Sequence, residues 1–189
     1  MDIYRYLEKP WHAHAWTKGG EIPLFPSSTY RKMERESIYT PDENLTMKST
    51  IDVNKIPGVS FNVEAGGSIT NVGSIGGSGM PDFHLDELSH WDGLALCFSG
   101  RLDEDVAHRM KKKICIKVAD IDALKSLIDK QLGVVSKAGW CEYTSGHQRD
   151  HFLKSDLDSW QVEYRIFWPI NEKVTVKLPA GIGEVVATY

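Results

Sequence analysis

The chain has 189 residues, of which 41% are hydrophobic and 25% are charged, and its formal net charge is −4 at pH 7. This length allows one hydrophobic core, and no linker-like stretch divides the sequence, so we expect a single domain over residues 1–189. Apart from three consecutive lysines at residues 111–113, the basic residues are scattered, which excludes a broad basic surface for duplex nucleic acid.

The cysteines and the hydropathy pattern indicate where the protein works. Cys97, Cys115 and Cys141 are widely spaced and without a metal-ligand pattern, which is typical of reduced thiols in a reducing compartment. The N-terminus is charged, and no apolar run approaches the length of a membrane span. We therefore expect a soluble, cytoplasmic protein without a membrane partner.

The first half of the chain predicts short strands and loops. Residues 3–7 (IYRYL) predict a strand, and residues 10–20 predict a short helix that begins at a proline and ends at a glycine pair. Residues 21–37 predict a strand interrupted by two prolines and then a brief charged helix. Residues 40–64 hold two strand-like fragments. The glycine-rich residues 65–82 lack the spacing of a phosphate loop and predict a mobile loop or hairpin tip.

The second half of the chain holds the clearest elements. Residues 93–100 (GLALCFSG) form a continuous apolar run, which predicts a buried strand ending at Ser99. Residues 120–133 predict the best helix, with Asp120 as N-cap and Gly133 as C-cap. Because strands outnumber helices, we expect an α+β fold with a mostly antiparallel sheet and flanking helices. The remaining elements are a helix in 101–112 and strands in 113–118, 140–145, 173–179 and 182–189, the last two closing the sheet.

Two polar residues interrupt an otherwise strand-like run near the C-terminus. Residues 155–168 (SDLDSWQVEYRIFW) predict a strand because their apolar side chains recur with a period of two, which places Gln161, Glu163 and Arg165 on the opposite face. If that face looks into solvent, these are ordinary surface residues. If it looks into a cleft, an amide and a carboxylate stand about 6.6 Å apart and can hold a sugar.

Metal sites and hydrolase triads are not predicted. His12 and His14 are two residues apart, which points them to different faces of a helix, and no His-Glu-x-x-His or Cys-x-x-Cys spacing occurs. The Gly-x-Ser-x-Gly motif of a hydrolase nucleophile is also missing from the sequence.

The polar residues at the ends of the apolar strands follow a recognisable order. Arg5 lies in the first strand, Ser99 ends the buried strand, and Gln161 and Glu163 form a late Gln-x-Glu. In this order the chain resembles the ADP-ribosyltransferase superfamily of the Arg-Ser-Glu type. The ending, with its Lys…Trp…Glu-x-Arg pattern, is also similar to an uncharacterised bacterial family found near defence genes; the residues that fit are Lys154, Trp160, Glu163 and Arg165.

The resemblance implies a split, mostly antiparallel sheet and the transfer of ADP-ribose from NAD as co-substrate. Breaking the nicotinamide glycosidic bond passes through an oxocarbenium-like state, which a carboxylate stabilises. Glu163 takes this catalytic role, and Gln161 orients the acceptor group.

The same resemblance assigns NAD-binding residues. Arg5 pairs with the dinucleotide phosphates, where a guanidinium fits the geometry. Ser99 braces Glu163 or the ribose, although Ser27 and its neighbour compete for the serine's role. Tyr30 stacks on nicotinamide.

In this superfamily the loop before the Gln-x-Glu strand faces the acceptor. Here that loop offers Arg149 and Phe152, which suit the phosphates and bases of a nucleic acid, while a solvated loop would look much the same. The resemblance implies an ADP-ribosyltransferase toxin or phage-defence effector that modifies a protein or nucleic acid and has an antitoxin or other neutralising partner. Two alternatives stay open: an NAD glycohydrolase, in which water replaces the acceptor, and a noncatalytic binding or regulatory module.

Overall fold

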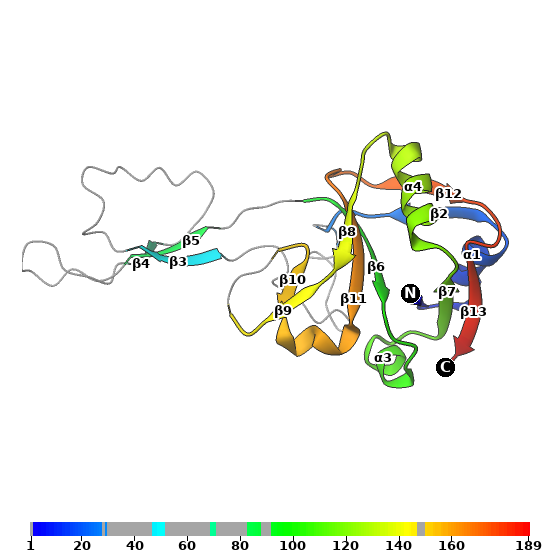
Figure 1. Ribbon diagram of the computed structural model, residues 1–189, viewed down its shortest axis with the longest axis horizontal. Helices are drawn as coiled ribbons and strands as arrows, with labels where there is room; N and C mark the ends of the chain where they lie inside the picture. The colour runs from blue at the N-terminus through cyan, green and yellow to red at the C-terminus, as the bar shows by residue number, and fades with distance from the viewer. Residues whose placement is uncertain are drawn as a thin grey trace, which may run out of the picture.

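A six-stranded antiparallel sheet lies at the centre of the computed structural model, with strand order β13-β7-β1-β6-β11-β8 (Figure 1). The structure describes residues 2–27, 29, 47–51, 69–70, 83–87, 92–146 and 150–189. The α+β class and the mostly antiparallel sheet that the sequence predicts are thus confirmed. The six strands are β1 (Ile3–Leu7), β6 (Leu94–Ser99), β7 (Ile114–Val118), β8 (Lys137–Trp140), β11 (Glu163–Trp168) and β13 (Gly183–Thr188).

Short helices and three small sheets complete the described elements. The helices are α1 (His14–Thr17), α3 (Glu104–Arg109) and α4 (Ile121–Leu132), with 3-10 turns η1 (Pro10–Ala13) and η3 (Asp156–Gln161). Strand β2 (Gly20–Leu24) pairs with β12 (Val174–Leu178), and β9 (Glu142–Thr144) pairs in parallel with β10 (Leu153–Ser155). Strands β3 (Met47–Ile51), β5 (Phe83–Glu87) and β4 (Ile69–Thr70) form the third small sheet. The strand in residues 173–179 therefore pairs outside the central sheet, contrary to the sequence prediction.

The main hydrophobic core covers one face of the central sheet. Successive residues of a strand point to opposite faces, and the buried set on this face includes Leu96, Ile116 and Ile166. Leu124 and Ile128 of α4 are fully buried in the same core. Further members come from α1 and from the β2–β12 pair: Trp16, Ile22, Leu24, Val176 and Leu178.

Helix α4 has the caps that the sequence predicts. The Asp120 side chain accepts hydrogen bonds from the backbone N–H groups of Asp122 and Ala123 at 3.0 and 2.9 Å, which satisfies donors left open at a helix start. Gly133 ends the helix with φ 67°, in the left-handed region that glycine enters without strain. With 12 residues, α4 is the longest described helix, and none of the described helices could cross a membrane.

The opposite face of the sheet carries a smaller core and a polar region. Val106 and Ala107 of α3 pack there with Tyr6 and Cys115. Directly paired residues of an antiparallel ladder share a face, and Glu163 is paired with Ser99. This face therefore holds the polar side chains at the ends of β6 and β11.

The central sheet consists of two three-stranded halves, β13-β7-β1 and β6-β11-β8, which are joined at one pair of residues. Strands β1 and β7 are paired at five positions and β6 and β11 at six. Strands β1 and β6, which join these two halves, are paired only at Tyr4 and Ser99. Beyond that row, β1 and β6 make no further ladder pairs.

The strand predicted over residues 155–168 begins later than expected. Residues 156–161 form the 3-10 turn η3, and β11 starts at Glu163. The Ser155 hydroxyl caps the turn by accepting from the Leu157 N–H at 3.4 Å. Serine and aspartate side chains near the start of a turn compete with ladder hydrogen bonds, and this local preference outweighs the period-two pattern.

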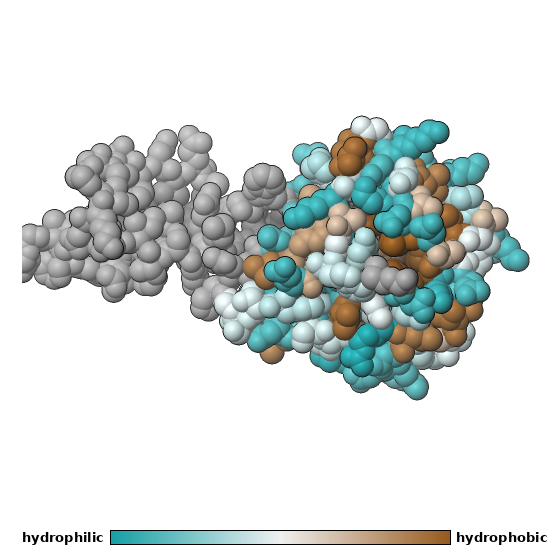
Figure 2. All heavy atoms as spheres, in the orientation of Figure 1, coloured by the Kyte–Doolittle hydropathy of each residue, from teal (hydrophilic) through white to brown (hydrophobic). Residues whose placement is uncertain are grey.

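Large hydrophobic side chains are exposed at several separate places. On the face visible in Figure 2, apolar residues form patches separated by hydrophilic ones. The most exposed are Trp11 in η1, Val135 after α4 and Leu157 in η3, at 67%, 80% and 81%. They belong to three different elements, and scattered single apolar residues are normal on a protein surface.

Candidate functional site

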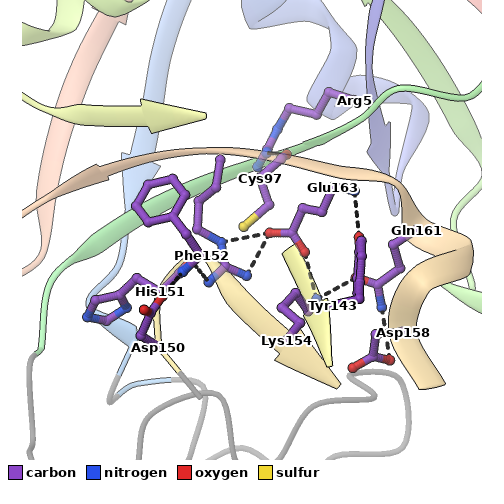
Figure 3. A network of polar contacts seen from close by, with 11 residues as sticks. Arg5, Cys97, Tyr143, Asp150, His151, Phe152, Lys154, Asp158, Gln161 and Glu163 are labelled. Carbon is purple, nitrogen blue, oxygen red and sulfur yellow. Dashed lines mark hydrogen bonds and ion pairs between the residues drawn. The ribbon is translucent and has the colours of Figure 1, made fainter. Parts of the chain in front are cut away.

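Glu163 lies in a buried network of charged groups at the start of β11 (Figure 3). Its Oε1 accepts hydrogen bonds from the Arg165 guanidinium, from Nε at 2.7 Å and in the ion pair with NH2 at 2.6 Å. Its Oε2 accepts from Lys154 Nζ at 2.7 Å. All three side chains are at most 5% exposed. Two cations at such distances favour the ionised carboxylate over the protonated acid.

Gln161 joins the network through the same lysine. Its Oε1 accepts from Lys154 Nζ at 2.6 Å, and its Nε2 points to Asp158 Oδ1 at 3.4 Å. Asp158 is 1% exposed. Because lysine can only donate, these contacts fix which end of the Gln161 amide faces Lys154. The amide and the carboxylate that the sequence singled out are thus brought together by a third residue.

The backbone between Gln161 and Glu163 is held in an unusual conformation. Val162 has φ 42° and ψ 60°, in the left-handed region. A β-branched residue is strained there. Three hydrogen bonds fix this turn: the N–H groups of Gly100 and Cys141 donate to the carbonyls of Val162 and Glu163 at 2.8 Å, and the Ser99 hydroxyl donates to the Gln161 carbonyl at 2.8 Å.

Tyr143 of β9 closes the network from the side of the small parallel sheet. Its hydroxyl accepts the Glu163 backbone N–H at 2.8 Å. Burial raises the pKa of Tyr143 to about 12, so the phenol stays protonated at neutral pH. It therefore contributes a neutral hydroxyl beside Glu163.

Ser99 is the predicted serine that lies beside Glu163. Besides its bond to the Gln161 carbonyl, its Oγ accepts from the Arg101 N–H at 3.1 Å, and Ser99 is 2% exposed. Ser27 lies elsewhere: its hydroxyl donates to Asp92 Oδ1 at 2.9 Å, just before the opposite end of β6. The structure therefore brings Ser99, and not Ser27, to the network.

Arg5 points to the other face of the sheet. Its guanidinium carbon lies 5.5 Å from the Trp16 ring centroid and 5.7 Å from that of Phe98, both in the main core. Such contacts between a cation and aromatic faces are attractive. Its NH1 donates to the Cys97 carbonyl at 2.6 Å, where β1 and β6 have separated. Figure 3 shows Arg5 on the opposite side of the sheet ribbons from Glu163.

Phe152 lies in the turn before β10 and not in the network. Lys137 Nζ lies 4.5 Å from the centroid of its ring. The preceding residue, His151, stacks on Phe167 at 3.9 Å between centroids, and its carbonyl accepts from Arg165 NH1 at 2.8 Å. The turn is therefore tied to β11. Two other predicted residues, Tyr30 and Arg149, fall outside the described residues.

Four members of the network had no role assigned from the sequence: Lys154, Arg165, Asp158 and Tyr143. Lys154 belongs to the quoted Lys…Trp…Glu-x-Arg pattern, so a signal for it existed. Nothing in the sequence places Tyr143 beside Glu163, because that contact depends on the segment after β8 running alongside β11, where the Cys141 N–H donates to the Glu163 carbonyl.

Similarity to known proteins and possible metal ligands give no further candidate site. No model of a known protein family matches the chain, and neither a curated protein nor a solved structure matches it. Within the described part of the chain, no three His, Cys, Asp or Glu side chains gather as metal ligands would.

Proposed function

We propose that the protein is an NAD-dependent ADP-ribosyltransferase in which Glu163 is the catalytic carboxylate. The observation that carries the proposal is the row Tyr4–Ser99–Glu163 across β1, β6 and β11. In this row the strands that bear the arginine, serine and glutamate of the resemblance lie side by side, where the two halves of the sheet are joined. A sheet divided in this way is what the resemblance implies.

The chemistry needs an ionised carboxylate beside the ribose. In the reaction, the bond between the ribose C1′ and the nicotinamide nitrogen breaks, and its electron pair leaves with nicotinamide. An acceptor nucleophile then bonds to C1′ and loses its proton to solvent. Glu163, held ionised between two cations, opposes the positive charge that develops on the ribose. Gln161, fixed beside it, orients the acceptor.

The other assignments follow the resemblance. Ser99 braces the Gln161–Glu163 turn. The resemblance gives Arg5 the NAD phosphates, but its side chain lies against Trp16 and Phe98 on the other face of the sheet from Glu163, so the proposal does not rest on Arg5. Tyr30 contacts nicotinamide, and Arg149 with Phe152 contacts a protein or nucleic-acid acceptor. The expected setting is the bacterial cytoplasm, with the protein acting as a toxin or phage-defence effector and an antitoxin as its partner.

One observation favours a noncatalytic binding or regulatory module instead. Both carboxylate oxygens of Glu163 are occupied by cations, and the residue is 4% exposed. A carboxylate in this position serves stability or specificity in many folds. The two functions differ in whether NAD is consumed.

The test is incubation of the purified chain with NAD labelled in its adenylate half, together with bacterial protein and nucleic acid. Label on a macromolecule supports the transferase, free ADP-ribose indicates the glycohydrolase, and intact NAD indicates the noncatalytic module. Glu163→Gln should abolish turnover. The matched control is Glu104→Gln, which removes a carboxylate that is 74% exposed.

A further inference from the structure

Lys154 is the most deeply buried cation of the network, with 2% of its surface exposed. Lysine is almost never fully buried unless it is paired. Removing a charge from water costs free energy that an ion pair repays only with good geometry. The partners of Lys154 are Glu163 Oε2 and Gln161 Oε1, at 2.7 and 2.6 Å. The lysine thus contacts both residues of the Gln-x-Glu pair.

Lys154 and Arg165 hold the carboxylate from two different elements. Arg165 lies on β11 itself and takes Oε1, whereas Lys154 comes from β10 and takes Oε2. With one oxygen fixed by each cation, the plane of the carboxylate is defined. The same ammonium group donates to the side-chain carbonyl oxygen of Gln161, so the Nε2 end of that amide faces Asp158. Without Lys154, no group in this arrangement would hold both the Glu163 carboxylate and the Gln161 amide in their orientations.

The cations also connect Glu163 to the turn that precedes β10. Arg165 NH1 donates to the His151 carbonyl, and Lys154 follows that residue by three positions. In the proposed function this turn belongs to the acceptor side. A shift of the turn therefore moves the groups that hold the carboxylate.

We infer that Lys154 is a positioning residue, which fixes the orientation and ionisation of Glu163 and the orientation of the Gln161 amide from the acceptor side of the site. This inference rests on the proposed function. Lys154 contacts Glu163 and Gln161, and it acts on the reaction through them.

The charge balance around Glu163 predicts a pH effect. The titratable groups near the network come from five elements and one turn: Cys97 of β6, Tyr143 of β9, Lys154 of β10, Asp158 of η3, Arg165 of β11, and Asp150 and His151 of the turn before β10. Tyr143 is neutral at working pH and adds no charge to the network. The positive charge that keeps Glu163 ionised comes from Lys154 and Arg165. Removal of one cation lets Glu163 bind a proton at higher pH. The acid limb of the rate profile then moves toward neutral pH.

The experiment compares Lys154→Met with wild type in the full chain, using steady-state NAD turnover from pH 4 to 8. Methionine keeps the unbranched apolar stem of the side chain, ends one atom short of the ammonium group and removes its charge. We expect kcat to fall about tenfold or more at pH 7, KM for NAD to change less than about twofold, and the acid limb to move up by about one pH unit. The matched control is Lys125→Met, which breaks a lysine–aspartate ion pair on α4 whose lysine is 24% exposed. It should leave both kcat and the acid limb unchanged.

The outcomes separate this inference from the proposed function. If wild type leaves NAD intact, the proposed function fails and this role of Lys154 fails with it. If wild type turns over NAD and folded Lys154→Met keeps its kcat and acid limb, only the inference is overturned. Lys154→Gln, which keeps a donor without the charge, replaces the methionine variant if that variant unfolds. Carbon-13 NMR of wild type tests the inference without any variant, because it follows the protonation of the Glu163 carboxyl as the pH is lowered. If this carboxyl binds its proton in the same pH range as exposed carboxyls, the inference is also overturned.

Discussion

Replacing Glu163 by glutamine should destabilise the fold as well as stop turnover. Glutamine has nearly the shape of glutamate but no charge, so Glu163→Gln leaves Lys154 and Arg165 without their anion. The three side chains are between 2% and 5% exposed, so solvent screens them little. Their separations of 2.6 and 2.7 Å are those of direct charge-assisted hydrogen bonds.

The magnitude follows from the class of interaction. Removing one partner of a buried ion pair costs about 3–5 kcal/mol, because a charge stays buried without compensation. An exposed pair costs about 0–1 kcal/mol. Glu104→Gln serves as the matched control, because Glu104 pairs with His108 at 3.4 Å and both side chains are at least 70% exposed. The two glutamine variants should therefore differ in unfolding free energy by several kcal/mol.

Urea unfolding, followed by tryptophan fluorescence, measures the difference. With a slope of about 2–3 kcal/mol per molar urea, the midpoint of Glu163→Gln should fall by about 1–2.5 M. Adding Lys154→Met to Glu163→Gln removes one of the stranded cations, so the double variant should be less destabilised than the sum of the single variants. A midpoint for Glu163→Gln within error of Glu104→Gln would refute the idea that Glu163 neutralises two buried cations.

Three further predictions test other parts of the structure. Gly93→Ala should lower the free energy of unfolding by about 3 kcal/mol or more, because a Cβ there meets the Phe167 ring and lies 2.5 Å from the Trp168 carbonyl oxygen. Gly139→Ala, with open space around the new Cβ, should leave thermal unfolding almost unchanged. Burial pushes the pKa of Asp129 up, but hydrogen bonds from Lys125, Ser136 and Trp168 outweigh it and lower this pKa overall. Asp129 therefore stabilises the fold at pH values above the pKa that it has in the unfolded chain, and this stabilisation is lost as the pH falls through its folded-state pKa. The difference in unfolding free energy between wild type and Asp129→Asn should shrink on acidification. A difference that stays constant with pH would contradict this. Val162→Gly should be more stable than Val162→Ala by about 1 kcal/mol, the reverse of the usual order, because only glycine relieves the left-handed backbone; the usual order in urea unfolding would mean that Val162 is not strained.

The sequence predicted the regular elements best where one local signal was enough. The buried strand β6, the strand β7 and the capped helix α4 follow from a continuous apolar run, an alternating run and an Asp/Gly cap pair. The shared face of Glu163 and Arg165 is also confirmed, since both lie on β11.

The parts of the site that could not be predicted depend on contacts between distant segments. Arg5 faces the main core because of the parity of β1 relative to β6, which a sequence pattern does not fix. Tyr143 reaches Glu163 because the segment after β8 runs alongside β11. Ser99 lies at the end of β6 that is paired with Glu163, whereas Ser27 bonds to Asp92 near the other end. Gln161 was expected on a strand, but its segment turns because serine and aspartate precede it.

Two destabilising features, a buried ion-pair network and a strained valine, occur together at the Gln161–Glu163 turn. Together they argue against a purely structural role for this turn. A buried ion-pair network is often no more stable than a well-packed apolar one, and a valine in the left-handed region costs about 1–3 kcal/mol. Each feature could be replaced by a less destabilising residue: an apolar side chain in place of Lys154, and glycine in place of Val162. A turn that served stability alone would gain from either change. Strain and buried charge persist together where a particular arrangement of polar groups is needed, so the turn is where a ligand or a reaction should be sought first.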